Sequence, residues 1–394
     1  MTLPSVYLHA LGMVNALGGD VDSIASALAA AQSPGMGPMR TRRGDAFVGR
    51  VLAPLDIAPP ASVARFDCRN NRLLLAALEQ IRPDIEAARE RFGSARIGVV
   101  LGTSTSGIGA AEEAFLHRAE AGCLPERFDY RQMEIGTAAP FAAAAMNLQG
   151  PAFTISTACT SSAKAFVAAR RLLQLGLCDA IVVGGVDTLC ELTLQGFASL
   201  ESTSPSRTNP MSRNRNGINI GEGAAVFLMT RDEGAVRLAG AGESSDAHHV
   251  SAPDPQGVGG ELALRAALAD AGVTPAGIGY VNLHATATRK NDEMESHLMA
   301  RVFPQVVPAS GTKPLTGHLL GAAGATEVGF AWLTLTRARF PLPLHQWDGV
   351  ADPGLPALDL VQEERHLSQE ASQRYVMSNS FAFGGSNVSL ILAG

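Results

Sequence analysis

A single cysteine lies where a protein chain can activate a nucleophile. Cys159 is followed by Thr160, Ser161 and a run of small and apolar residues, a pattern that predicts the start of a helix. The N–H groups and the positive end of the dipole at a helix start favour a thiolate, and they can also stabilise an oxyanion. Cys159 is therefore a candidate nucleophile for attack on a thioester. The alternative is a buried, unreactive small residue.

Two histidines occur in segments built from very small residues. His284 ends an apolar run and begins the sequence HATAT, and His318 lies within the sequence KPLTGHLLGAAG. A histidine taken alone is more often a hydrogen-bonded structural residue. Side chains this small leave room for a substrate close to the backbone, so the context favours a functional role for both rings.

Alternating apolar and Ala-rich segments predict the elements that must position these residues. We expect buried strands at 97–102, 180–185 and 388–392, and helices over 71–88, 161–175 and 260–271. This alternation indicates an α/β fold. The same arrangement occurs twice, because a helix follows Cys159 and a small-residue helix follows His318. We therefore predict two similar halves, residues 1–235 and 236–394.

Composition and charge exclude several classes of protein. The 394 residues are 46% hydrophobic and 17% charged, which is too apolar for a disordered chain. A net charge of −6 argues against nucleic acid as a partner. Neither a membrane span nor a signal peptide is indicated, and we expect a cytoplasmic protein. Five cysteines without CxxC spacing indicate reduced thiols and no metal site.

Several motifs in order resemble the β-ketoacyl-acyl-carrier-protein synthases, or ketosynthases, of the Cys-His-His class. Over essentially the whole chain the matching segments are TACTS around Cys159, HATAT at His284, KPLTGHLLGAAG around His318 and NSFAFGGSN from Asn379. Initiating synthases differ by an Asn in place of His318, and thiolases by a second, C-terminal cysteine. The resemblance implies a thiolase fold, a duplicated five-layer αβαβα arrangement.

The resemblance also implies a reaction, the decarboxylative condensation of an acyl group on Cys159 with malonyl-acyl-carrier protein in fatty acid or polyketide synthesis. His284 and His318 would donate N–H bonds to the malonyl thioester oxygen, which requires uncharged rings. The backbone N–H groups of Cys159 and Phe383 would form the oxyanion hole. Phe383 would also gate the tunnel for the carrier arm, and Gly384 would permit its movement and contribute to substrate binding.

Further matching positions concern support and substrate. Lys313 and Glu295 match paired charges beside the histidines, and a buried lysine needs such a carboxylate. Thr286 and Thr288 match hydroxyls that bind the phosphopantetheine arm of the carrier protein, and no other cofactor is expected. Thr105 aligns with the acyl pocket, in a GTSTSGI segment similar to that of aryl-polyene ketosynthases.

The resemblance names acyl-carrier protein as the main partner. Arg69 and Arg72 match the docking helix for this acidic protein, and the alternative for them is a solvated helix face. We expect a homodimer, or a heterodimer with a subunit like a chain-length factor. The rival function is that of a ketosynthase-like subunit that mainly pairs with another synthase, although such subunits typically lack the nucleophile.

Overall fold

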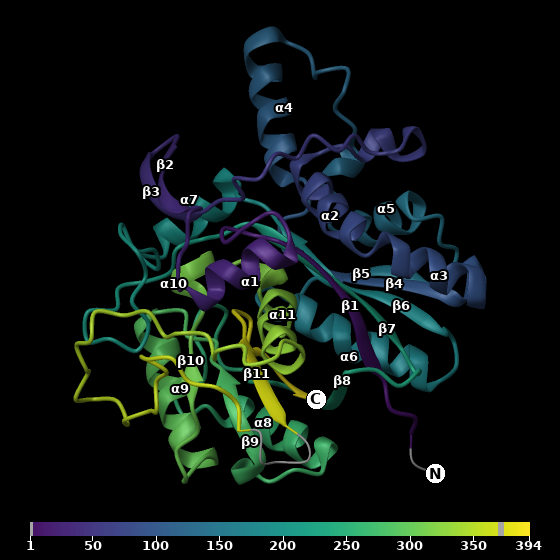
Figure 1. Ribbon diagram of the computed structural model, residues 1–394. Helices are drawn as coiled ribbons and strands as arrows, with labels where there is room; N and C mark the ends of the chain where they lie inside the picture. Colours follow the sequence, from purple (N-terminus) through teal and green to yellow (C-terminus); the bar gives the residue numbers. More distant parts are fainter. Residues whose placement is uncertain (1–2, 369–373) are drawn as a thin grey trace.

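The computed structural model describes residues 3–368 and 374–394 (Figure 1). Its strands are β1 (Tyr7–Val14), β2 (Met36–Thr41), β3 (Gly44–Gly49), β4 (Ile97–Gly102), β5 (Ala152–Ile155), β6 (Ala180–Asp187), β7 (Gly223–Thr230), β8 (Val236–Ser245), β9 (Ile278–Asn282), β10 (Ala309–Ser310), β11 (Tyr375–Phe381) and β12 (Ser386–Ala393). Its α-helices are α1 (Val21–Ala29), α2 (Arg69–Gln80), α3 (Arg82–Phe92), α4 (Ile108–Ala121), α5 (Ala138–Ala145), α6 (Ser161–Gln174), α7 (Glu191–Ser199), α8 (Val258–Ala271), α9 (Arg289–Val302), α10 (Lys313–Thr316) and α11 (Ala323–Thr336).

Two groups of strands follow the same pairing pattern. In the first, β4 pairs in parallel with β5 and β6, and β6, β7 and β1 continue antiparallel. In the second, β9 pairs in parallel with β10 and β11, and β11, β12 and β8 continue antiparallel. Among the described residues, the short pairing of β1 with β8 joins the two groups into one sheet. Since β7 ends at Thr230 and β8 begins at Val236, we keep the division after residue 235 as a proposal.

Helices separate and cover the two groups of strands. Helices α6 and α11 contact strands of both groups and lie in the middle of the molecule (Figure 1). Helices α2 and α5 cover the outer face of the first group, and α8 covers the second, with α9 beside it. The layers therefore follow the order αβαβα that the family resemblance implies. In the described part of the chain, no helix has the length and apolar character needed to cross a membrane.

The predicted strands and two of the three predicted helices are confirmed, with shifts of a few residues at their ends. The helix expected over 71–88 is wrong as a single element, because α2 ends at Gln80 and α3 begins at Arg82. Pro83 lies in the first turn of α3. Its ring removes an N–H donor and would clash with the carbonyl of the residue four positions earlier, so one continuous helix cannot run through this point, whereas the first turn of a new helix tolerates proline.

The first turns of α6 and α11 touch because glycine allows it. A Cβ atom on Gly324 would lie 2.9 Å from the Cβ of Ala163, and one on Gly102 would lie 2.2 Å from the backbone N of Ser162. The N–H of Ala325 donates a hydrogen bond of 2.9 Å to Ser162 Oγ. The segments that lead into the two helices are therefore held close together at the centre of the molecule.

This contact predicts that Gly324→Ala destabilises the protein. The added methyl group would press on Ala163, and overpacking of this kind costs about 1–3 kcal/mol of the free energy of unfolding. Gly37→Ala is the matched control, because a Cβ there meets nothing within 4 Å, and its effect should stay within about 0.5 kcal/mol. Denaturant unfolding measures both values, and equal stability of the two variants would contradict the tight contact.

Candidate active site

A sharp turn between β5 and α6 presents Cys159. The residue precedes Thr160, the N-cap of α6, and so lies just before the helix. Ala158 has a φ of +52°, a left-handed conformation that turns the chain at this point. Ser161 fixes the turn, because its Oγ accepts from the N–H of Thr157 at 2.9 Å and donates to the carbonyl of Ala158 at 2.6 Å.

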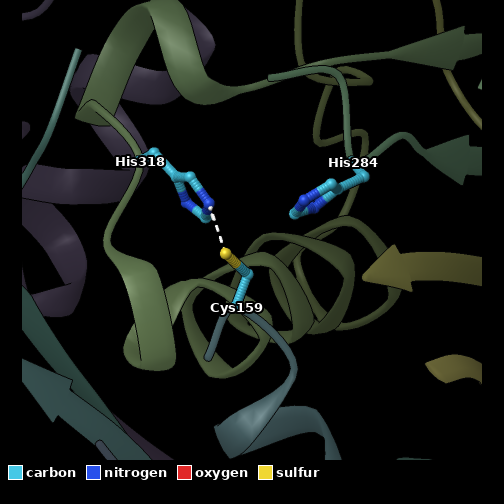
Figure 2. A group of neighbouring side chains, drawn as sticks. All are labelled: Cys159, His284 and His318. Carbon is cyan, nitrogen blue, oxygen red and sulfur yellow. Dashed lines mark hydrogen bonds between the residues drawn. The ribbon is translucent and has the colours of Figure 1, made fainter. Parts of the chain in front are cut away.

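Both histidines face the sulfur of Cys159. His284 follows β9, and His318 lies in the segment that leads into α11. Nε2 of His318 is 3.0 Å from Cys159 Sγ (Figure 2). The two imidazole rings lie 5.3 Å apart at an interplanar angle of 84°. All three side chains are buried, with at most 5% exposed. The structure thus brings together the three residues that the sequence analysis singled out.

Burial keeps this group uncharged. It lowers the pKa of both His284 and His318 well below the ordinary value, and the charge of Lys313 lowers them further. Burial also raises the pKa of the Cys159 thiol to about 12, although Lys313 and the backbone N–H of Phe383 favour the thiolate. At neutral pH the rings are therefore neutral, and each ring has one N–H donor and one acceptor nitrogen.

Lys313 pairs with Glu327, and the expected pairing with Glu295 is wrong. The Lys313 Nζ to Glu327 Oε1 distance is 2.6 Å, and both side chains are almost completely buried. The same ammonium donates to the carbonyl of His284 and lies 3.4 Å from its Nδ1. Because an ammonium can only donate, Nδ1 of His284 is an acceptor, and the ring proton is on Nε2.

Glu295 holds the backbone of the histidine segment. Its two carboxylate oxygens accept the N–H groups of His284 and Ala285, each at 2.7 Å. Burial raises the pKa of Glu295 to about 7, against these two hydrogen bonds that lower it. Glu295 therefore positions His284 through its main chain, while Glu327 balances the lysine.

Asp187, at the end of β6, is a site residue that sequence reasoning missed. Its buried carboxylate accepts hydrogen bonds from the hydroxyls of Thr103 and Thr105, the N–H groups of Ser104 and Thr105, and the N–H of Gly321. It thereby ties the loop after β4 to the segment that follows His318. An acid at the carboxyl end of a buried strand was the available signal for Asp187, and an acid inside an apolar helix was the signal for Glu327.

A cavity of about 280 Å³ contains Cys159 and both histidines. Thr286 and Thr288 line it, with their hydroxyl oxygens 2.9 Å apart. Phe383 also lines it, and its ring centroid lies 5.5 Å from that of Phe197. The positions expected to bind the carrier arm and to gate the tunnel therefore share one cavity with the nucleophile.

Thr105 and Gly384 do not contribute to the wall of this cavity. The Thr105 hydroxyl donates to Asp187 at 2.8 Å and accepts from the N–H of Thr188, so it is occupied by the loop contacts. Gly384 is exposed beside Phe383, with a φ of +85° that suits glycine. Their assignment to substrate binding stays a prediction, and for Thr105 the geometry indicates a structural contact instead.

The two arginines expected to dock the carrier protein are held by carboxylates. Arg69 binds the buried Glu222 through two nitrogens, at 2.8 and 2.5 Å. Arg72 binds Asp67 in the same way, at 2.6 Å for both contacts. Each pair is close to neutral as a unit. Docking by these arginines stays a prediction, and it would have to compete with the ion pairs.

Cys159, His284 and His318 also have the composition of a metal site, because their ligand atoms lie within 4.8 Å of one another. Zinc accepts such sulfur and nitrogen ligands. Binding would require the thiolate, which burial disfavours here. The expectation of no metal cofactor stays a prediction.

The Lys313–Glu327 pair predicts a specific pattern of rescue. Lys313→Met leaves the buried Glu327 without its cation and should lower the free energy of unfolding by about 3–5 kcal/mol. Adding Glu327→Leu should recover most of the loss, whereas adding Glu295→Gln should recover little. Denaturant unfolding of the three variants measures this. If Glu295→Gln restored the stability of the Lys313→Met variant and Glu327→Leu did not, Glu295 would be the true partner of Lys313.

His345 predicts a pH dependence of stability. Its Nδ1 accepts from the N–H of Gly311, and burial lowers its pKa from 6.5 to about 4. Between these pH values the unfolded chain binds a proton that the folded chain does not, so the stability falls as the pH falls. Between pH 7 and pH 4, the free energy of unfolding of the variant His345→Gln should fall by about 3 kcal/mol less than that of the wild type. Parallel pH profiles from denaturant unfolding would contradict this.

Comparison with known proteins finds relatives along the whole chain. The chain is 31% identical to 3-oxoacyl-[acyl-carrier-protein] synthase 2 of Vibrio cholerae, over 99% of both chains. Among solved structures it is similar to the ketosynthase ApeO of Xenorhabdus doucetiae, which was solved in complex with its chain length factor ApeC. The sequence identity is 45% and the TM-score is 0.94, and the match covers 99% of this chain and 98% of the solved chain. A β-ketoacyl synthase from Burkholderia phymatum matches at 28% identity and a TM-score of 0.84, with 99% of both chains covered.

Two family models cover most of the chain. The N-terminal domain of β-ketoacyl synthase matches residues 49–235, and the C-terminal domain matches residues 235–346. These matches and the structural likeness confirm the expected thiolase-type α/β fold. The chain therefore belongs to the β-ketoacyl synthase family.

Proposed function

We propose that this protein condenses an acyl group, held on Cys159, with malonyl-acyl-carrier protein to give β-ketoacyl-acyl-carrier protein. The observation that carries the proposal is the placement of two neutral histidines around one sulfur, with His318 Nε2 3.0 Å from Cys159 Sγ, in a cavity that Thr286 and Thr288 also line. Family membership supports the same reaction class, an acyl transfer.

In the first step, Cys159 Sγ attacks the thioester carbonyl of the acyl-carrier protein. A new sulfur–carbon bond forms, the bond to the carrier sulfur breaks, and the thiol proton leaves with the carrier thiol. The Nε2 atom of His318 contacts Sγ, and the N–H that it supplies in the second step stabilises the sulfur as this proton leaves. The N–H groups of Cys159 and Phe383 favour negative charge at this point, which suits an oxyanion hole.

In the second step, the malonyl thioester loses carbon dioxide, and the electron pair moves into an enolate. Nε2–H of His284, whose tautomer is fixed by Lys313, donates to the enolate oxygen, and His318 donates beside it. The enolate carbon attacks the acyl carbonyl, a carbon–carbon bond forms, and Cys159 leaves as a thiolate that takes up a proton.

The proposed partners are acyl-carrier protein, whose phosphopantetheine arm carries the substrates, and a second ketosynthase-like subunit. Helix α4 stands out at one end of the molecule (Figure 1) and exposes the apolar side chains of Phe115 and Leu116. Two adjacent exposed apolar side chains on a protruding helix suit burial against another subunit. Since ApeO was solved with a chain length factor, we propose a heterodimer with such a subunit, a homodimer being the alternative, and action in the cytoplasm.

The rival role, a subunit that pairs with a synthase and lacks activity of its own, is disfavoured by the complete site. Cys159, His284, His318 and the Lys313–Glu327 pair are all in place. A subunit without catalytic function has no need of a buried ion pair that orients a histidine.

Cys159→Ala should abolish transfer of the acyl group to the protein. Wild type, incubated with an acyl-acyl-carrier protein, should gain the mass of one acyl group by intact-protein mass spectrometry, and Cys159→Ala should gain none. Cys123→Ala is the control, because Cys123 is the exposed thiol most open to unspecific transfer, and it should keep the adduct. Absence of an adduct on wild type with every acyl donor would refute the proposed function.

A further inference from the structure

The mouth of the cavity of Cys159 carries two cations that no part of the proposed mechanism uses. Arg289 and Lys290 line this cavity and are both exposed. Within residues 3–368 and 374–394 neither side chain has an ion-pair partner, in contrast to Arg69 and Arg72. The lining includes a single carboxylate, that of Glu201. The mouth therefore has an excess of positive charge, although the protein as a whole has a net charge of −6.

One short segment connects these cations to the reacting group. From His284 to Lys290 the chain lines the cavity with His284, Thr286 and Thr288 in turn, and the exposure of these residues rises along the segment from 1% at His284 and 6% at Thr286. The seven residues of this segment can span at most about 25 Å. A substrate arm that lies along this segment thus has its thioester at the histidine and its far end at the cations.

Arg69 and Arg72 are less available to an anion than Arg289 and Lys290 are. Arg69 and Arg72 each have a bidentate carboxylate partner, so an incoming anion would have to displace it. Arg289 and Lys290 offer their full charge without such a cost. A phosphate group is a strong hydrogen-bond acceptor that arginine and lysine both bind.

We infer that Arg289 and Lys290 bind the phosphate at the far end of the phosphopantetheine arm and so set the depth at which its thioester meets Cys159. This inference rests on the proposed function, because it names the part of the substrate that these residues recognise. The ligand is the phosphate of the arm itself, and not the acidic surface of the carrier protein.

The test compares two small acyl donors, an acyl-phosphopantetheine thioester and the same acyl-pantetheine thioester without phosphate. The readout is the ratio of kcat/KM for acylation of Cys159 by the two donors. In the full-length wild type the ratio should favour the phosphorylated donor. In the variant Arg289→Ala with Lys290→Ala it should fall about tenfold, as the loss of two charge-assisted contacts at a solvated site requires.

Arg42→Ala with Arg43→Ala is the matched control, because these are adjacent exposed arginines that lie in the turn between β2 and β3 and do not line the cavity. This control should keep the wild-type ratio. An unchanged ratio in the Arg289/Lys290 variant would overturn the inference, and so would a loss seen only with intact acyl-carrier protein. Acylation of the wild type by either donor reports on the proposed function separately, so the two ideas fail independently.

Discussion

The close contact between the first turns of α6 and α11 is the constraint on which the active site depends. Cys159 and His318 lie far apart in the sequence, yet Cys159 lies just before α6 and His318 lies five residues before α11. Gly324 lets α11 approach Ala163 on α6, and Gly102 lets β4 approach the same turn. Backbone packed this closely cannot slide without steric conflict, so the sulfur and Nε2 of His318 are held 3.0 Å apart.

Burial then determines the chemical state of the group that this packing assembles. In a poorly solvated site an imidazolium and a thiolate are both disfavoured, and the site is neutral at rest. A lysine in the same environment needs compensation, and Glu327 provides it. With its charge secured, Lys313 can fix the tautomer of His284 and direct the N–H of that ring toward the cavity. The support of the site is thus as specific as its reacting residues.

The sequence predicted the nucleophile, both histidines, the α/β class and most element ends, because these depend on local pattern and on ordered motifs. It misjudged the helix over 71–88, where Pro83 interrupts an otherwise continuous apolar pattern. It also assigned Lys313 the wrong carboxylate, since Glu295 and Glu327 are both acids near the histidine segments in sequence. The place of Thr105 in the acyl pocket stays a prediction, and the structure adds that its hydroxyl belongs to the hydrogen bonds around Asp187.

By itself, the sequence determined which residue types are present and in what order, and from these the nucleophile, the histidines and the layered fold. Only the tertiary structure decided which charges meet. Glu327 reaches Lys313, Glu222 holds Arg69, and Asp187 accepts hydrogen bonds from two segments, the loop after β4 and the segment after His318. The physical reason is that ion pairs and hydrogen bonds act over a few ångströms, so they depend on distances between elements that no pattern along the chain contains.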